Sequence, residues 1–498
     1  MTQQILLQQD NTSKMSASYW CLLAIGMVDF LVITLAPYLN FYLNEMYLIP
    51  SILYLGFVLK QQKTSTAKQV FWLSGSMCAW FLIAQLIHHC MGLQTRPFGA
   101  IASVQLVALT FAATAEDKRR GLTLYMSVFL AGVFIVLCLA GLAIVNRVPV
   151  FLRNNAYFWK SGLIVMAHPS QLAGLLLIGI AFALVFFTIS KKIIVKAALC
   201  AMIGFLTVTI AMTKCQAVIW VMSALYGAFC LFAIYRGTFS RFVIGVIVAV
   251  LIFGSTYAIS QSIVRWYVSE QAQRSMGVHV STEQIVCGSA ADEAFMTANH
   301  EERNSAHFGN MRYLLRSAKA EENNEGEGKA DRFSLRDTLD RFLPSFNGRK
   351  KVWLEIYDVL KKDPKTILFG TDYTNSYMME HTGKNYAHAH NSWLEVLIGL
   401  GLPGLFIVSL VTAIAFWHVF IILFGNQYEL WQKCIALLEI CLMAIGAMEF
   451  HLFLSGLHPT DFTFFLCLGY MIQWRAADKA SRKNSQEKTV EEMTPVTE

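Results

Sequence analysis

The chain has 498 residues, of which 55% are hydrophobic and only 15% charged, and its formal net charge is +7. Soluble domains carry about 25% charged residues, so a water-soluble protein of this length is excluded, and most of the chain must have the bilayer as its solvent. The basic residues stand in short clusters between apolar stretches, which is typical of cytoplasmic membrane loops and not of a nucleic-acid-binding surface. We expect membrane lipids, and no nucleic acid, around this chain.

Apolar runs long enough to cross a bilayer recur along the chain and predict an all-α polytopic membrane protein with about twelve transmembrane helices. Nine runs precede a long polar segment and three follow it. The expected helices are 19–38, 41–60, 70–92, 97–115, 121–145, 171–189, 195–213, 216–235, 242–261, 394–424, 430–454 and 460–474.

The links between these helices sort by charge. The basic links are 60–68, 116–120, 190–196, 236–241 and 474–483. Because positive links stay in the cytoplasm, this pattern predicts five parts: an N-terminal cytoplasmic tail, helices 1–9, a large periplasmic loop between helices 9 and 10, helices 10–12 and a C-terminal cytoplasmic tail. The corresponding residues are 1–18, 19–261, 262–390, 391–474 and 475–498.

The long loop is the most informative segment, because loops of such length are usually functional or disordered. Its part 320–331 is polar and rich in Gly, whereas the part near 352–360 has helical periodicity, with Val352, Ile356, Val359 and Leu360 on one face. Asn347-Gly348 is a turn or capping signal before this helix, and Asp363-Pro364 is a stop signal after it. The loop is therefore predicted to be partly helical.

Three features near the outer face could carry chemistry. Arg349, at the expected start of the loop helix, suits a phosphate group, although from the spacing alone a solvated arginine beside Lys350 and Lys351 is the simpler interpretation. His388, His390 and Asn391 lie where the loop meets the tenth helix; a histidine there could accept a proton from a hydroxyl or be an interfacial polar residue. Lys214 lies between two helices and is either functional or extends its ammonium group to the membrane interface.

Other polar residues give weaker signals, and a structural role is the simpler interpretation. Asp29, Glu439 and Glu449 fall inside expected helices, and His168 precedes the proline that opens the sixth helix. The chain has no phosphate-binding Gly-rich loop and no zinc-protease or serine-hydrolase motif. No carboxylate or cysteine cluster accompanies the His-x-His pair, so we predict neither a metal site nor a cofactor.

Three elements together resemble the O-antigen ligase and O-antigen polymerase superfamily. The segment GRKKVWLEIYDVLKKDPKTILFG (348–370) is similar to its G-R-x-x-x-W loop helix, and HAHNSWLEVLIGLGLPGL to its H-N-x-x-L-E helix start with a glycine step. Upstream, WKSGLIVMAHPSQLAG (159–174) is similar to its H-P-x-x-L-A element. One departure is that Gln216 occupies the position where the family often has arginine, while Lys214 lies two residues earlier.

The resemblance implies a multi-pass enzyme of the bacterial inner membrane whose active site faces the periplasm. It implies inverting, metal-independent glycosyl transfer from a polyprenyl-diphosphate-linked glycan to an acceptor hydroxyl, most simply on lipid A-core, in lipopolysaccharide biosynthesis. On this basis His390 is the expected base and Arg349 a catalytic cation, with Lys214 also binding the diphosphate. His388, Asn391, Gln216 and His168 are expected to support them.

Several alternatives remain open at this point, and one is a non-enzymatic assembly partner, which would tolerate the loss of both Arg349 and His390. The acceptor could instead be the end of another repeat unit, and the chain would then be an O-antigen or capsule polymerase. It could also be a protein Ser or Thr, which would make it a protein O-oligosaccharyltransferase. A protein of another class, a flippase or transporter of lipid-linked sugars, would place charged residues near the membrane midplane, where only Asp29 and Glu439 look deep.

Overall fold

The computed structural model describes residues 27, 65–92, 120–146, 169–235, 237–276, 344–371, 374–383, 389–449, 452–453 and 459–493. Every regular element within these residues is a helix, which confirms the predicted helical class. Three predicted segments (19–38 apart from Met27, 41–60 and 97–115) lie outside the described residues, as do His168 and His388.

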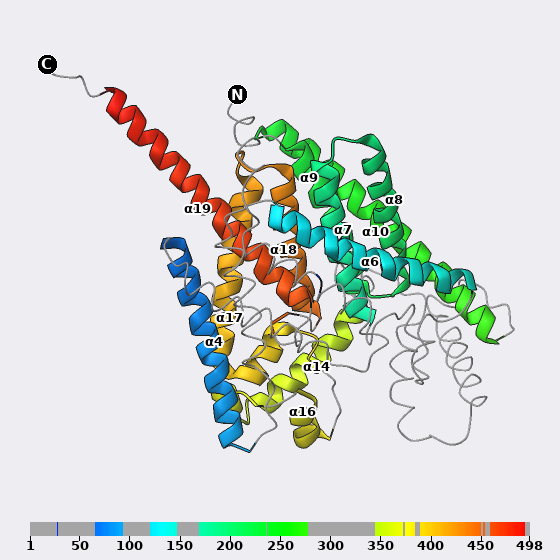
Figure 1. The fold of residues 1–498 in the computed structure, drawn as a ribbon. Coiled ribbons are helices and arrows are strands. Elements are labelled where there is room, and N and C mark those ends of the chain that lie inside the picture. The colour runs from blue at the N-terminus through cyan, green and yellow to red at the C-terminus, as the bar shows by residue number, and fades with distance from the viewer. Residues whose placement is uncertain are drawn as a thin grey trace, which may run out of the picture. The chain divides into compact units, whose positions relative to one another are not determined.

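The described helices follow one another along the chain as shown in Figure 1. They are α4 (Ser65–Cys90), α6 (Arg120–Asn146), α7 (Pro169–Ile189), α8 (Ile193–Met212), α9 (Gln216–Ile234), α10 (Phe239–Met276), α14 (Pro344–Leu360), α15 (Pro364–Phe369), α16 (Thr374–Thr382), α17 (Ser392–Phe424), α18 (Leu430–Met448) and α19 (Pro459–Met493).

Seven helices in the described part of the chain are long and apolar enough to cross a membrane. These are α6, α7, α8, α9, α10, α17 and α18. The predicted spans at 70–92 and 460–474 coincide with helices α4 and α19. The predicted total of about twelve spans, and the placement of the long loop, stay predictions.

The chain forms two compact units, one of residues 1–263 with 358–498 and one of residues 264–357. In the larger unit, α18 packs against α7, α9, α17 and α19. Helix α7 is apolar on all sides, and almost all of its side chains from Leu172 to Val185 are buried. A helix without a polar face can only be stable when it is surrounded by other helices or lipid. The described parts of the smaller unit are 264–276 and 344–357.

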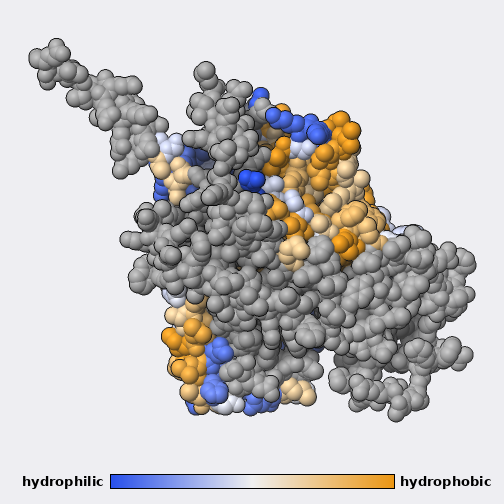
Figure 2. All heavy atoms as spheres, viewed as in Figure 1, coloured by the Kyte–Doolittle hydropathy of each residue, from blue (hydrophilic) through white to orange (hydrophobic). Residues whose placement is uncertain are grey.

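Helices α8 and α10 keep large apolar side chains on the surface of the larger unit. Figure 2 shows an extended hydrophobic surface over these helices, with hydrophilic residues at its edge. The exposed side chains include Ile193, Ile194, Phe205, Ile244, Ile247, Val250 and Leu251. Apolar area on this scale is unfavourable in water, so this surface is one that the hydrocarbon core of a bilayer would cover.

Several helix ends differ from their predicted positions. Helix α14 begins at Pro344, before the expected turn at Asn347-Gly348, and α18 ends at Met448 rather than at residue 454. Helices α10 and α19 continue to Met276 and Met493, beyond their apolar runs. The segments 262–276 and 475–493 contain neither Gly nor Pro, so their helical propensity persists after the hydrophobicity ends.

Helix α17 is broken near its beginning. It has 33 residues, and Gly401 within it has φ +68° and ψ −171°, which is far from helical, with Pro403 two residues later. At about 1.5 Å per residue, the straight part after Gly401 is already long enough to cross a bilayer core of about 30 Å. The nine residues before the break therefore form a separate short helix, and His390 and Asn391 lie at its start.

Candidate functional site

His390 lies immediately before α17, at one end of the helix bundle of the larger unit. Its backbone is left-handed, with φ +51°, and its ring is about one third exposed. Its Nδ1 atom lies 3.3 Å from Oε2 of Glu449, the residue that follows α18. The carboxylate is almost fully buried, with 3% of its side chain exposed. The structure thus pairs the predicted base with Glu449, for which the sequence alone predicts a structural role.

The same carboxylate contacts the turn between α8 and α9. The thiol of Cys215 lies 3.8 Å from Oε1 of Glu449, within hydrogen-bond distance for sulfur. Lys214 precedes this cysteine and has a left-handed backbone, with φ +58°. Glu449 therefore joins the histidine of α17 to the turn that carries Lys214, two features that lie far apart in the sequence.

The spacing of the H-N-x-x-L-E motif has a direct structural reason. The side chain of Asn391 caps α17 by accepting a hydrogen bond from the N–H of Leu394 at 3.0 Å, and its Nδ2 donates to the carbonyl of Ala447 at 3.0 Å. The carboxylate of Glu395 accepts the N–H of Ala389, the residue before His390. The motif thus fixes the backbone on both sides of the histidine, and Asn391 acts on the helix rather than on the imidazole.

Left-handed backbone at residues other than glycine is confined, among the described residues, to this end of the bundle. The three positions are Lys214, His390 and Phe453. Phe453 is fully buried, and its N–H donates to Asp461 at 3.1 Å. Each such conformation costs about 1–3 kcal/mol and tends to persist at functional sites. Their concentration here marks this end of the bundle as the candidate site.

The end of the long loop is anchored to the break in α17. Gly370, with φ +78°, lies so close to this helix that a Cβ atom would come within 2.6 Å of the carbonyl oxygen of Gly399, and one on Gly401 would meet the carbonyl of Leu368. The N–H of Thr371 donates to the carbonyl of Ile398 at 2.6 Å. The glycines of the two motifs are thus explained by one backbone contact.

Helix α4 completes this contact with two polar side chains. Trp80 donates its indole N–H to the carbonyl of Leu400 at 3.1 Å, and the fully buried His88 places Nε2 3.1 Å from the carbonyl of Phe369. Both carbonyls lie where helical hydrogen bonding is interrupted, so a side chain has to satisfy them. The hydrophobicity of the segment 70–92 gave no signal for these two roles.

Asp363 begins a new helix in addition to ending the one before it. It caps α15, accepting from the N–H of Thr366 at 3.2 Å and from its hydroxyl at 2.6 Å, while Pro364 occupies the first helical turn. Partial burial acts to raise the pKa of Asp363, but these hydrogen bonds and the nearby His381 lower it more, so its pKa lies below the usual value. The Asp-Pro pair both ends α14 and begins α15.

The remaining predicted residues have separate positions. The Oε1 atom of Gln216, at the start of α9, accepts a hydrogen bond from Gln261 at 2.6 Å. Arg349 lies in the second turn of α14, within the smaller unit, and is half-buried. The expectation that it stands beside free N–H groups at a helix start is wrong, because α14 begins five residues earlier. Its pairing with His390 stays a prediction.

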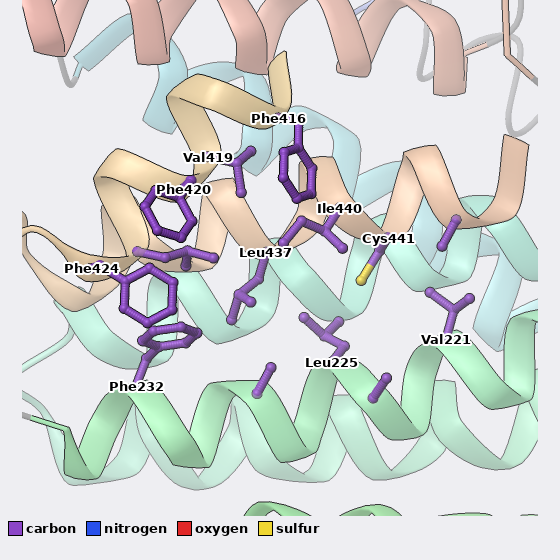
Figure 3. A pocket seen from close by; sticks show the side chains of 14 residues that line it. Val221, Leu225, Phe232, Phe416, Val419, Phe420, Phe424, Leu437, Ile440 and Cys441 are labelled. Atoms are coloured by element: carbon purple, nitrogen blue, oxygen red, sulfur yellow. The ribbon is translucent and has the colours of Figure 1, made fainter. Parts of the chain in front are cut away.

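An apolar cavity of about 340 Å³ lies between α9, α17 and α18. Figure 3 shows side chains from the three helices pointing into it, with Val221 and Cys441 toward one end and Phe232 and Phe424 at the other. All fourteen lining residues are apolar. Ala444, the last lining residue of α18, is five residues before Glu449, so the cavity begins about 7 Å along the helix axis from the site.

Within the described residues, no group of three His, Cys, Asp or Glu side chains is arranged to hold a metal ion. The polar groups at this end of the bundle include the imidazole of His390 and the buried carboxylate of Glu449, and Lys214 lies on the neighbouring turn. Such a set can accept a proton and attract an anion.

Comparison with known families matches residues 205–409 to the family model described as O-antigen ligase. This match supports the O-antigen ligase superfamily that the sequence motifs resemble. The match begins within α8 and ends within α17, so it includes the turn with Lys214, the loop with α14 and α15, and the break at Gly401. Glu449 lies outside it. No curated protein matches the chain.

The match supports a membrane enzyme of ligase or polymerase type that acts on lipid-linked glycans. The segment that defines the family supplies Lys214, His390 and Arg349, whereas the carboxylate on the histidine comes from the end of α18. A search of the matched segment alone would therefore miss Glu449. Its only sequence signal was a charged residue near the end of an apolar run.

Proposed function

We propose that this protein is an O-antigen ligase, which transfers a glycan from a polyprenyl-diphosphate donor to a hydroxyl of lipid A-core. One observation carries the proposal: His390 and the turn of Lys214 lie at the same end of one helix bundle, joined through Glu449. A general base and a cation at one site are what transfer from a diphosphate to a hydroxyl requires.

The reaction needs one displacement. The acceptor oxygen forms a bond to the anomeric carbon while the bond from that carbon to the diphosphate oxygen breaks, and the acceptor proton passes to His390. Charge grows on the departing diphosphate, and Lys214 together with Arg349 would stabilise it in place of a metal ion. Displacement in one step inverts the anomeric configuration. No nucleotide is required, because the donor already carries its leaving group.

The charge of the links supports a periplasmic site. His390 lies at the end of the bundle where α8 ends and α9 begins, so the links on their other sides, 190–192 and 235–238, lie at the opposite end. Lys191, Lys192 and Arg241 are exposed at or beside those links. The positive-inside rule assigns that end to the cytoplasm, which would leave His390 in the periplasm.

The apolar cavity offers a place for the donor's hydrocarbon tail. A diphosphate held near Lys214 would have the cavity directly beneath it, because the cavity starts about 7 Å from Glu449 along α18. From Val221 to Phe232 it extends along α9 for about 16 Å. An isoprenoid chain entering it would leave water without meeting any polar side chain of the lining.

The decisive experiment is transfer in proteoliposomes with a polyprenyl-diphosphate oligosaccharide, a chelator and three separate acceptors. We expect product with lipid A-core, and not with free repeat-unit donor or with a Ser/Thr peptide. His390→Ala should lower the transfer rate by about 10²–10⁴-fold, which is the usual contribution of a general base. Product only with the second or third acceptor would identify a polymerase or a protein O-oligosaccharyltransferase instead, and a metal requirement would contradict the Arg/Lys mechanism.

One observation favours a lipid-linked sugar transporter. Glu439 is fully buried in α18, and neither of its carboxyl oxygens has a hydrogen-bond partner in the described part of the chain. Intramembrane ionisable residues often mark transport pathways. Movement of the labelled donor across the proteoliposome membrane without any glycosyl product would support this alternative and reject the ligase proposal.

A further inference from the structure

We propose that Glu449 is a positioning residue that holds His390 in the tautomer with its proton on Nδ1. This inference rests on the proposed function. An ionised carboxylate can only accept hydrogen bonds, so in the neutral ring the Nδ1 atom, 3.3 Å from Oε2, must be the donor. The other nitrogen, Nε2, is then the unprotonated one, and it is the atom that takes the acceptor proton.

The burial of the pair sets the direction of the ring. Glu449 is 3% exposed and His390 33% exposed, so the carboxylate side of the ring is directed into the protein. Exposed histidines change tautomer and orientation freely, whereas a buried carboxylate on one nitrogen selects a single arrangement, as it does in catalytic triads. The geometry therefore presents a preoriented base.

Glu449 is itself held by three different elements. Its backbone N–H donates to the carbonyl of Ile445 at the end of α18. Its carbonyl accepts the hydroxyl of Ser392 in α17 at 3.3 Å, and Oε1 lies 3.8 Å from the thiol of Cys215 in the α8–α9 turn. The carboxylate thus links the position of the base to the turn that carries the cation Lys214.

The other charged groups at this end of the bundle, within the described residues, have contacts of their own. Glu395 of α17 accepts the backbone N–H of Ala389, and Asp461 of α19 accepts that of Phe453. Lys214 is on the α8–α9 turn. The carboxylate of Glu449 lies within ion-pair distance of the imidazole, with Oε2 3.3 Å from Nδ1.

The test measures kcat and KM of the full-length protein in proteoliposomes for Glu449→Gln and Glu449→Ala. We expect kcat to fall by about 10²-fold in Glu449→Ala, a loss within the range of general-base catalysis, with the KM for both substrates little changed. The kcat of Glu449→Gln should fall less, because the amide oxygen of glutamine can still accept a hydrogen bond from Nδ1. Glu429→Ala is the matched control, since Glu429 is a glutamate at the opposite end of the same helix, where it caps the start of α18, and it should keep wild-type kcat.

A spectroscopic readout separates positioning from a merely structural role. In protein with ¹⁵N-labelled histidine, the signals of His390, assigned by their loss in His390→Ala, should report Nδ1–H in the wild type and a shift toward Nε2–H in Glu449→Ala. An unchanged tautomer, an unchanged kcat, or an equal loss in Glu429→Ala would overturn the inference. If instead His390→Ala transfers glycan normally, the proposed function itself fails.

Discussion

The turn between α8 and α9, which carries Lys214, has a backbone conformation fixed by local hydrogen bonds. Lys214 adopts φ +58°, and the hydroxyl of Thr213 donates to the carbonyl of Ile210 at 2.6 Å while accepting the N–H of Cys215 at 3.3 Å. These bonds shape a tight turn directly beside Glu449. Although Gln216 stands at the family's usual arginine position, the turn offers an amine two residues earlier.

We predict that Lys214→Gln lowers kcat by about 10²–10³-fold, the usual loss for one preorganised group that stabilises developing charge. Lys214→Arg should retain most of the activity, because it keeps the positive charge. The measurement is transfer in proteoliposomes at matched protein levels, with Lys192→Gln as the control, since Lys192 is an exposed lysine on a link at the other end of the bundle. Equal rates for Lys214→Gln and the wild type would reject a role for this amine.

Arg349 is expected to act as the second cation, although it lies inside α14 and not at its start. We predict that Arg349→Ala abolishes transfer while the protein still inserts into the membrane. Lys350→Ala is the matched control, because Lys350 is the next residue of the same helix and is exposed. The comparison is the transfer rate in membranes that contain equal amounts of each variant. Normal transfer by Arg349→Ala would contradict the two-cation mechanism.

Among the structural elements, the break in α17 has the clearest dependence on sequence. Gly401 has φ +68°, and both it and Gly370 lie against backbone atoms of the other segment. A side chain at either position meets main-chain atoms, which cannot move aside as the end of a flexible side chain can. The short helix that starts after His390 thereby depends on two glycines.

Gly401→Ala should therefore destabilise the folded protein by more than the about 1–3 kcal/mol expected for the backbone conformation alone. Gly370→Ala should behave in the same way. Gly204→Ala in α8 is the control, since no atom lies within 4 Å of a Cβ built there. Thermal unfolding of the three purified variants in detergent checks this, and equal unfolding temperatures would show that the contact is dispensable.

Helix positions could be predicted from the sequence because length and hydrophobicity determine them; the run 121–145 corresponds to Arg120–Asn146. Helix ends were less predictable where propensity outlasts hydrophobicity, as after residue 261. The carboxylate on His390 could not be predicted, because Glu449 is 59 residues away along the chain and only the packing of α17 on α18 brings the two together. Pattern alone indicates which residue types are present, not which of them meet.

At the scale of the whole molecule, the apolar surfaces of α8 and α10 and the basic links at one end are consistent with a single orientation in the bilayer. Lys192 is exposed on the link before α8, and Glu380 is exposed on α16, in the segment between α15 and α17. In the proposed orientation, Glu380 faces the periplasm and Lys192 the cytoplasm.

Labelling of single cysteines tests this orientation. In a chain whose eleven cysteines are replaced by alanine, Glu380→Cys should react with a membrane-impermeant maleimide in intact spheroplasts. Lys192→Cys should react only after lysis, because the membrane then no longer shields it. The reverse pattern would place His390 in the cytoplasm and contradict a periplasmic reaction.

Because Lys214 and His390 have left-handed backbone conformations, thermal stability and catalysis favour different residues at these two positions. Glycine adopts this conformation without steric penalty, so a selection for heat-resistant variants would favour glycine at both positions. The same replacements would delete the amine and the imidazole. Selection for thermal stability alone should therefore yield variants with glycine at these two positions. Such variants should be more stable than the wild type but unable to transfer glycan.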